Sequence, residues 1–190
     1  MCRKLLPGVG ALCSAHLVQD LLLESDVGQP SGVRSGPISA GQTPPMGPRN
    51  RLLLALSAEE FSLLEPQLER APLTVGMRLV EPNTPIEHVY FLEEGKAAIV
   101  AITPQGRRIE AGIIGREGLT GMPVLLGADR TPHECFVQTP GAALRIGADD
   151  LRRAMAASAS LHQHLLRFAQ AFMIGEGLGL LEIGVGMHPA

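Results

Sequence analysis

Residues 85–115, "PIEHVYFLEEGKAAIVAITPQGRRIEAGIIG", decide the fold of this chain. Apolar and polar side chains alternate in short runs, and turn residues recur at intervals of about eight to twelve positions. The four residues "TPQG", 103–106, place proline second and glycine fourth, which is typical of a turn joining two paired strands. This pattern predicts antiparallel β-structure.

The same period extends outward from this stretch. It begins near Leu73, and two further short strands are expected in "ECFVQT" (134–139) and "AALRI" (142–146). The whole block is interpreted as a small barrel or roll of about eight strands. Before it, "RLLLAL" (51–56) and a capping box of Ser57 with Glu60 predict a two-part helical lead-in that ends near Pro66.

A helical period returns at Ala148. An apolar or small residue recurs at spacings of three and four, at Leu151, Ala154, Ser158, Leu161, Leu165, Phe168 and Phe172. This stripe packs either on the chain's own barrel or against a second copy, and the dimer is the preferred hypothesis, with Leu161, Leu165, Phe168 and Phe172 as its interface. The small residues "AASAS", 156–160, leave open a break that would reset the helix.

The remaining segments set the domain boundaries. Residues 1–27 are expected to form a helical segment, since Leu17, Val18, Leu21 and Leu22 share a helical face. Residues 28–49 are rich in glycine and proline and are expected to be a disordered linker. The main domain is assigned to residues 50–174, and residues 175–190 to a flexible tail because glycine stops helices.

Composition excludes several partner classes. The 190 residues carry 16 basic and 19 acidic side chains, a balance that gives no overall attraction to nucleic acid or anionic lipid. The apolar runs fall short of the roughly 20 residues needed to span a bilayer. Cys2, Cys13 and Cys135 form no C-x-x-C pair, so a disulfide framework and a zinc site are not indicated, and a reducing cytoplasm fits best.

Catalytic and metal chemistry find little support. His88 and His133 stand alone, and His162 and His164, two apart on a helix, point in different directions, whereas a chelating helical pair is spaced four apart. The sequence has no G-x-S-x-G elbow. We therefore predict neither a metal site nor an enzyme.

The order of these features resembles a known family. A helical lead-in, "PIEHVYFLEEGKAAIV" (85–100), "IGREGLTGMPVLLG" (114–127), "DRTPHECFVQTPGAALRI" (129–146) and a long helix resemble the effector domain of the Crp/Fnr superfamily of bacterial transcription regulators. The likeness covers about residues 50–174. It implies a mainly β fold with flanking helices, a double-stranded β-roll (jelly roll) of the cyclic-nucleotide-binding type followed by a long dimerisation helix.

The resemblance also implies a ligand site. In family members that bind cyclic nucleotides, amides of a short helix at a glycine-rich turn, an arginine and the hydroxyl beside it hold the cyclic phosphate, as free helix amides and a guanidinium favour an anion. The ligand-binding residues implied here are Gly118, Leu119, Thr120, Gly121, Arg130 and Thr131. No cofactor is predicted; the implied effector is a small anion, with cyclic AMP or cyclic GMP as the first candidates.

Three departures leave the effector open. Leu119 stands where those members carry the acidic residue that binds the ribose, and Glu117 precedes the glycine. Pro132, directly after the Arg-Thr pair, has no amide hydrogen to donate. Gly118 and Arg130 are one residue further apart than the spacing expected from those members. Another effector, or none, therefore remains an alternative.

The end of the chain completes the prediction. After the long helix, regulators of the family carry a helix-turn-helix domain that reads DNA, and here "GEGLGLLEIGVGMHPA", 175–190, follows instead. We expect an effector-sensing domain of a Crp/Fnr-like transcription regulator that forms a homodimer and does not itself bind DNA or a membrane. The alternative is a ligand-free protein-interaction or dimerisation module.

Overall fold

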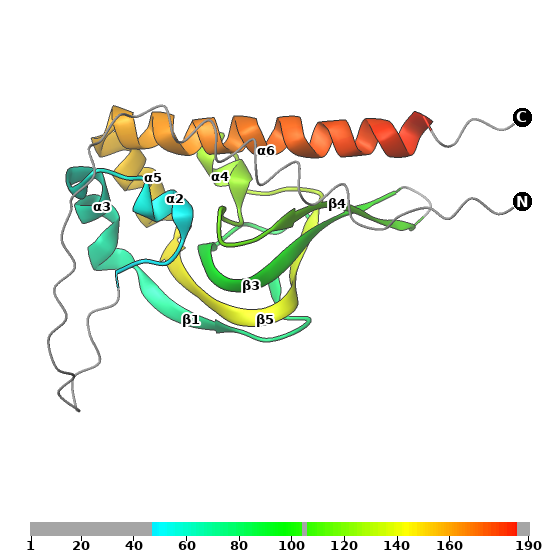
Figure 1. Ribbon diagram of the computed structural model, residues 1–190, viewed down its shortest axis with the longest axis horizontal. Helices are drawn as coiled ribbons and strands as arrows, with labels where there is room; N and C mark the ends of the chain where they lie inside the picture. The colour runs from blue at the N-terminus through cyan, green and yellow to red at the C-terminus, as the bar shows by residue number, and fades with distance from the viewer. Residues whose placement is uncertain (1–46, 104–105, 186–190) are drawn as a thin grey trace, which may run out of the picture.

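The computed structural model describes residues 47–103 and 106–185, and of 176–185 the backbone only. A strongly curved antiparallel sheet forms the lower layer in Figure 1, and the long helix α6 (Ala159–Val185) runs across the top. The short helices gather at one end of the sheet, beneath the start of α6. The sequence of lead-in, sheet and long helix is the one expected.

The lead-in consists of three short helical pieces: α2 (Arg51–Leu54), α3 (Ala58–Leu64) and the 3-10 turn η1 (Glu65–Gln67). The capping box at the start of α3 is confirmed. The amide of Glu60 donates to Oγ of Ser57 at 3.2 Å, and the amide of Ser57 donates to Oε2 of Glu60 at 2.9 Å. Two amides that a helix start leaves without partners are thereby satisfied.

Five strands make up the sheet: β1 (Glu69–Leu73), β2 (Arg78–Val80), β3 (His88–Ile102), β4 (Arg108–Ile114) and β5 (Glu134–Gly147). Their order is β1-β5-β3-β4, and β2 pairs with the other part of β5. All these pairs are antiparallel, as the period of two predicted. The ladder between β3 and β5 joins the whole sheet and fixes its curvature.

The predicted count of about eight strands is corrected to five within the described residues. β3 and β5 each run on where the sequence indicated two short strands, because the break positions bend the strand without ending it. Gly95 adopts φ +85°, and a side chain at Gly141 would collide with the carbonyl oxygen of Glu94. The two glycines therefore let the bent strands cross closely while their ladder continues with register shifts.

The predicted pairing of the strands on either side of residues 103–106 is confirmed. Ile102 pairs with Arg108, the amide of Gly106 donates to the carbonyl of Thr103 at 2.8 Å, and the amide of Thr103 donates to the carbonyl of Arg107 at 2.9 Å. Gly106 has φ +77°, a left-handed conformation that favours glycine. Turn chemistry thus sets the register of β4 on β3.

The late helical stretch is divided in two. α5 (Ala148–Ala157) ends at Ser158, whose φ of −139° and ψ of 109° are extended, and α6 follows. The break that "AASAS" left open is present. The predicted helix end at residue 174 is corrected to Val185, because a glycine inside a helix costs only about 1 kcal/mol relative to alanine and does not by itself stop it.

One hydrophobic core connects these elements. Fully buried side chains come from the lead-in, from β3 and β5 and from α5 and α6, among them Leu52, Leu64, Phe91, Ile146, Leu151, Leu161 and Phe168. Each such side chain contributes about 1.5–3 kcal/mol by leaving water. Within the described residues, no helix combines the length and apolarity needed to cross a bilayer.

Most of the predicted N-terminal segments, and the end of the predicted tail, lie outside the described residues. The helical segment 1–27 lies outside the described residues, as does the linker 28–49 except for residues 47–49, which form neither helix nor strand. Residues 186–190 of the predicted tail also lie outside them.

Candidate functional site

The glycine-rich segment between β4 and the short helix α4 (Met122–Leu125) forms a tight turn, residues 115–121, hereafter the corner. Its first half is closed by its own polar groups. The amide of Gly115 donates to Oε1 of Glu117 at 3.0 Å, and the amide of Gly118 donates to the carbonyl of Gly115 at 3.2 Å. The carboxylate of Glu117 is therefore engaged in shaping the turn.

The second half of the corner is bonded to β3. Leu119 forms a β-bridge with Phe91. The amide of Thr120 donates to the carbonyl of Tyr90 at 2.9 Å, and the hydroxyl of Thr120 accepts from the amide of Tyr90 at 3.2 Å. Leu119 and Thr120 are fully buried. These two predicted ligand residues thus form part of the core and its hydrogen bonds.

Both predicted corner glycines are packed too closely for a side chain. A Cβ added to Gly118 would lie 2.8 Å from Cζ of Phe168 and 3.2 Å from Cγ2 of Ile114. Gly121 has φ +70°, precedes α4, and an added Cβ would lie 3.1 Å from Cγ2 of Val89. The backbone of the corner therefore rests directly on a side chain of α6.

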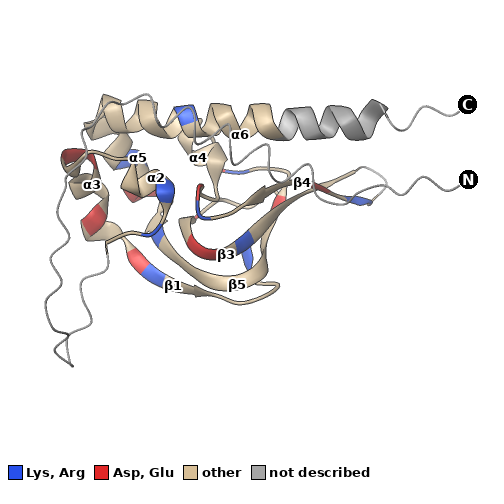
Figure 2. Ribbon diagram, in the orientation of Figure 1, with Lys and Arg blue, Asp and Glu red and all other residues tan. Residues whose placement is uncertain are grey.

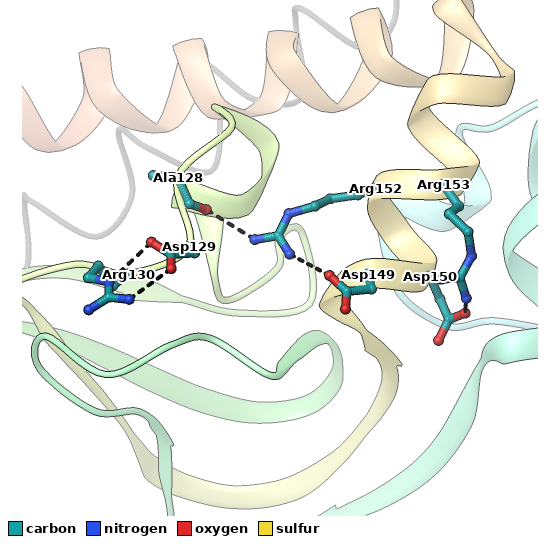
Figure 3. A network of polar contacts seen from close by, with 7 residues as sticks. All are labelled: Ala128, Asp129, Arg130, Asp149, Asp150, Arg152 and Arg153. Atoms are coloured by element: carbon teal, nitrogen blue, oxygen red, sulfur yellow. Dashed lines mark hydrogen bonds and ion pairs between the residues drawn. The ribbon is translucent and has the colours of Figure 1, made fainter.

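The segment 129–133, hereafter the arginine turn, holds the other predicted ligand residues at the surface. Arg130, whose side chain is 55% exposed, donates from Nε and Nη2 to the two carboxylate oxygens of Asp129 at 3.1 and 2.9 Å (Figure 3). The hydrogen bond from Arg130 lowers the pKa of Asp129 below its ordinary value. The hydroxyl of Thr131 accepts from the amide of His133 at 3.2 Å. Asp129 therefore already occupies the fork of the guanidinium.

The corner and the arginine turn border the same loop before β3. The amide of Ile86 donates to the carbonyl of Asp129 at 2.7 Å, and Cγ2 of Ile86 lies 3.3 Å from the position of a Cβ on Gly121. The amide of Asn83 donates to the carbonyl of Thr131 at 2.7 Å. The structure thus places both halves of the predicted site against one loop.

A further guanidinium connects the arginine turn to α5. Arg152 donates to Oδ1 of Asp149 at 2.7 Å and to the carbonyl of Ala128 at 3.4 Å, while Arg153 pairs with Asp150 (Figure 3). Each of these arginines stands three residues after its carboxylate on the same helix, a spacing at which side chains meet. The residue before Asp129 is therefore held by α5.

The side chains predicted for a dimer interface lie inside this chain. The exposed fractions of Leu161, Leu165, Phe168 and Phe172 are 0, 0, 2 and 8%. They pack on the chain's own core, the first of the two alternatives in the sequence. Any dimer face on α6 must therefore use other residues, and Met173 and Ile174, 51% and 44% exposed, are apolar side chains on its outer side.

A groove of about 470 Å³ lies between α4, α5 and α6. Its lining is mainly apolar and includes Leu126, Met155 and Leu166, with Arg152 and His162 as polar members. It contains none of the predicted ligand residues. This groove is consequently separate from the anion site that the sequence predicts.

The charged side chains, the potential metal ligands and the one cysteine of the described residues limit the chemistry of this region. Basic and acidic side chains alternate over the sheet and short helices, and Arg167 is the one such charge in residues 159–175 (Figure 2). No group of three or more potential metal ligands occurs among the described residues. Burial raises the pKa of the Cys135 thiol to about 12, which keeps it protonated and unreactive.

Sequence analysis missed two residues that shape this region. Asp129 stands directly before Arg130, and adjacent opposite charges were the available signal. Asn50 caps α2 and donates to the carbonyl of Gly118 at 2.8 Å. An asparagine directly before "RLLL" is an N-cap signal, but its bond to the corner has no local signature.

Comparisons with known proteins agree on the type of domain. Residues 73–158 match the family described as the cyclic nucleotide-binding domain. The N-terminal domain of a transcriptional regulator from Streptomyces coelicolor A3(2) is 22% identical, with a TM-score of 0.51 over 75% of this chain and 96% of that one. A cyclic nucleotide-binding domain from Methylobacillus flagellatus has a TM-score of 0.60 at 11% identity, covering 75% of this chain and 83% of its own.

A larger regulator has the same fold. The catabolite activator protein of Thermus thermophilus has a TM-score of 0.54 at 18% identity, and the alignment covers 70% of this chain and 62% of that protein. No curated protein sequence matches the chain. At these identities the solved structures establish the fold alone, and they confirm the predicted jelly roll with flanking helices.

Proposed function

Because residues 73–158 match the family described as the cyclic nucleotide-binding domain, we propose that the chain senses a small anionic effector and transmits its binding to α6. The observation that carries this proposal is the contact of Gly118 with Phe168. A corner that rests on a helix without an intervening side chain moves with that helix. Ligand binding can thus bias the position of α6, as a two-state switch requires.

The proposed anion site is the guanidinium of Arg130 with the hydroxyl of Thr131. A guanidinium fork binds a carboxylate and a phosphate with similar geometry. The bidentate pair with Asp129 supports this role, since both nitrogens of the fork donate to the oxygens of one anionic group. An incoming phosphate would exchange with the carboxylate of Asp129, so affinity reflects the difference between the two anions.

The effector is proposed to be recognised through its anion more than through a ribose. Leu119 is fully buried against Phe91, and the carboxylate of Glu117 accepts from the amide of Gly115. Leu119 has no side-chain acceptor for a sugar hydroxyl, and Glu117 already uses one carboxylate oxygen to shape the turn. Cyclic AMP and cyclic GMP remain the first compounds to test, with inorganic phosphate as a probe of the anion alone.

Isothermal titration and thermal shift on the full chain test the proposal. A ligand at 100 times its dissociation constant raises the stability by about 2.7 kcal/mol, which is readily detected. We expect Arg130→Ala to weaken binding about tenfold or more, the loss of one charge-assisted interaction. Arg107→Ala, an exposed arginine of the β3–β4 hairpin, is the matched control and should bind normally.

Two results would overturn the proposal. One is the lack of any heat or stabilisation with the cyclic nucleotides and phosphate at millimolar concentration. The other is binding that Arg130→Ala and Arg107→Ala affect equally, which would locate the ligand elsewhere.

Dimerisation through the outer side of α6 is the second proposed property. Met173 and Ile174 place two exposed apolar side chains next to each other on a helix with few charges, and such patches mark association surfaces. Light scattering should report a dimer that Ile174→Glu weakens and that Gln163→Glu, on an exposed turn nearer the start of α6, leaves intact. A monomer at all concentrations for the unmodified chain would exclude the dimer.

A further inference from the structure

Three consecutive residues of the lead-in bind the edge of the corner and the strand beneath it. The amide of Arg49 donates to Oε1 of the buried Glu93 at 2.9 Å. Asn50 donates to the carbonyls of Leu92 and Gly118, both at 2.8 Å. The amide of Arg51 donates to the carbonyl of Arg116 at 2.8 Å.

The side chain of Asn50 uses its full hydrogen-bonding capacity. Its Nδ2 makes the two bonds to strand and corner, and its Oδ1 accepts from the amides of Leu52 and Leu53, each at 3.1 Å. A side-chain amide has two donor hydrogens and two acceptor lone pairs. Because acceptors lie on one side and donors on the other, the orientation of the amide is fixed, and Asn50 is fully buried.

Helix capping explains only half of this arrangement. The N-cap role requires an acceptor, which Oδ1 supplies to the first turn of α2. Serine, threonine or aspartate would supply it equally well. The Nδ2 bonds point away from the helix, and asparagine is the small capping residue whose side chain also brings two donors to neighbouring carbonyls.

The corner is therefore held from two sides. Asn50 and Arg51 hold the carbonyls of Gly118 and Arg116 from the lead-in, and Phe168 of α6 lies against the Cα of Gly118. Removal of one support leaves the corner attached to β3 but free to change its distance from α6. The bonds from the lead-in thus decide how the corner meets the helix.

We propose that Asn50 is a positioning residue for the effector site, and that residues 49–51 act as a clamp that holds the corner in register with α6. This inference rests on the proposed function for its consequence in ligand binding. The clamp itself is independent of any ligand. The clamp and its effect on ligand binding are therefore two claims, and an experiment can contradict one without the other.

The first test compares two capping residues of the lead-in by hydrogen exchange on the full chain. Asn50→Ser keeps an acceptor for α2 and replaces the two Nδ2 donors to the corner and strand with a single hydroxyl on a shorter side chain. Ser57→Ala, at the start of α3, loses a cap and no bond to the corner. Relative to β5, amides of residues 116–121 should exchange about tenfold faster in Asn50→Ser and unchanged in Ser57→Ala.

A milder pair of variants covers the case in which Asn50→Ser does not fold. Position 51 is the first residue of α2, where proline is well tolerated, and the extended ψ of 127° at Asn50 suits a following proline. Arg51→Pro replaces the amide hydrogen that donates to Arg116 with a ring carbon that pushes this carbonyl away, and Arg51→Ala keeps the amide while shortening the side chain. Exchange of the corner should be faster in Arg51→Pro than in Arg51→Ala by about threefold to tenfold.

A pH readout separates the clamp from a general packing role. In Asn50→Asp the ionised carboxylate accepts for the cap but faces the carbonyls of Leu92 and Gly118 with no donor. Protonation returns one donor. After correction for intrinsic exchange, protection of residues 116–121 should therefore rise as the pH falls in Asn50→Asp and stay independent of pH in Asn50→Ser.

The outcomes distinguish this inference from the proposed function. Uniform loss of protection across β5 and the corner in Asn50→Ser, or equal exchange in Arg51→Pro and Arg51→Ala, would overturn the clamp. Faster corner exchange with unchanged affinity for a ligand that binds the unmodified chain would overturn the positioning role. If no ligand binds the unmodified chain, the proposed function fails while the exchange data still decide the clamp.

Discussion

The corner and the arginine turn contain the two halves of the predicted ligand site, yet they differ in burial and in bonding. Thr120 and Leu119 are fully buried, and the corner is hydrogen-bonded to β3 and to the start of the lead-in. Arg130 is more than half exposed and bonds to the carboxylate beside it in sequence. One half is part of the core, and the other can change partners at little cost.

This difference assigns separate tasks to the two halves. Groups of a buried segment that already make hydrogen bonds cannot bind a ligand without first breaking those bonds, which costs about 1–3 kcal/mol for each group left unsatisfied. An exposed ion pair is worth little to folding and can be exchanged. Under the proposed function, binding therefore falls to the arginine turn, and the corner transmits its position to α6.

The largest expected effect comes from Gly118→Ala. The new Cβ would lie 2.8 Å from Cζ of Phe168, which is buried and has little room to move. Overpacking of this kind costs about 1–3 kcal/mol, and we expect urea denaturation to report a loss in that range. Gly47→Ala, where nothing lies within 4 Å of the added atom, is the control and should be close to neutral.

A second background sharpens this test. In Phe168→Leu the smaller side chain leaves space for the added methyl, so the effect of Gly118→Ala should shrink. Coupling of about 0.5 kcal/mol or more between the two positions is typical of residues in contact. Additive effects would contradict the packing of the corner on α6.

Two threonines provide the next comparison, Thr120→Val against Thr131→Val. Valine preserves the shape of threonine and removes the hydroxyl. At position 120 the amide of Tyr90 would lose its buried acceptor, and we expect a loss of about 1–2 kcal/mol in unfolding free energy. At position 131 the hydroxyl is partly exposed, and the change should stay below about 0.5 kcal/mol. Equal losses would remove the distinction between the two halves.

Most of the fold was predictable because its signals are local. The capping box of Ser57 with Glu60, the turn before Arg107 and the alternation along β3 each depend on residues close in sequence. The two long strands were not recognised, since Gly95 and Gly141 resemble breaks until the crossing of the strands is known. Whether a glycine ends an element or bends it is decided by what lies opposite.

The candidate site residues could be named from the sequence, and their role in binding stays a prediction, but their burial could not be foreseen. Gly118 and Arg130 follow from the resemblance, and the structure places both around one loop. The pairing of Arg130 with Asp129, the bond from Asn50 to Gly118 and the burial of Phe168 in its own chain are tertiary facts. An apolar stripe such as Leu161 to Phe172 looks the same whether it covers a barrel or a partner helix.

The pH dependence of stability tests the buried face of α6, with a smaller expected effect. His164 lies one turn before Phe168 on α6, and its Nε2 is buried with no hydrogen-bond partner in the described residues. Burial, together with Arg167, lowers the pKa of His164 below its ordinary 6.5, although Glu60 and a hydrogen bond to the backbone of Leu52 act in the opposite direction. As the pH falls, His164 therefore takes up a proton in the unfolded chain before it does so in the folded chain.

The sign of the pH dependence follows from this order. As the pH falls below 6.5, the unfolded state is protonated at His164 before the native state, so the unfolding free energy decreases. Urea denaturation at about pH 7.5 and about pH 5.5 should give a lower stability at the lower value. His164→Gln should show a weaker dependence than the unmodified chain, and an unchanged dependence would assign it to other histidines.

The smallest effect on stability, and the most informative for function, is expected from Asp129→Asn. The pKa of Asp129 is lowered by its hydrogen bond with Arg130, so the pair favours the native state above the ordinary carboxyl pKa and loses this as the pH falls below it. Because both groups are exposed, urea denaturation should detect no change in unfolding free energy. Removal of the competing carboxylate should nevertheless strengthen the binding of phosphate or a cyclic nucleotide to Arg130, measured by isothermal titration at low salt. If Asp129→Asn weakens anion binding, the carboxylate orients Arg130 instead of competing for it, and the arginine turn is then held in place by its own ion pair as the corner is by its hydrogen bonds.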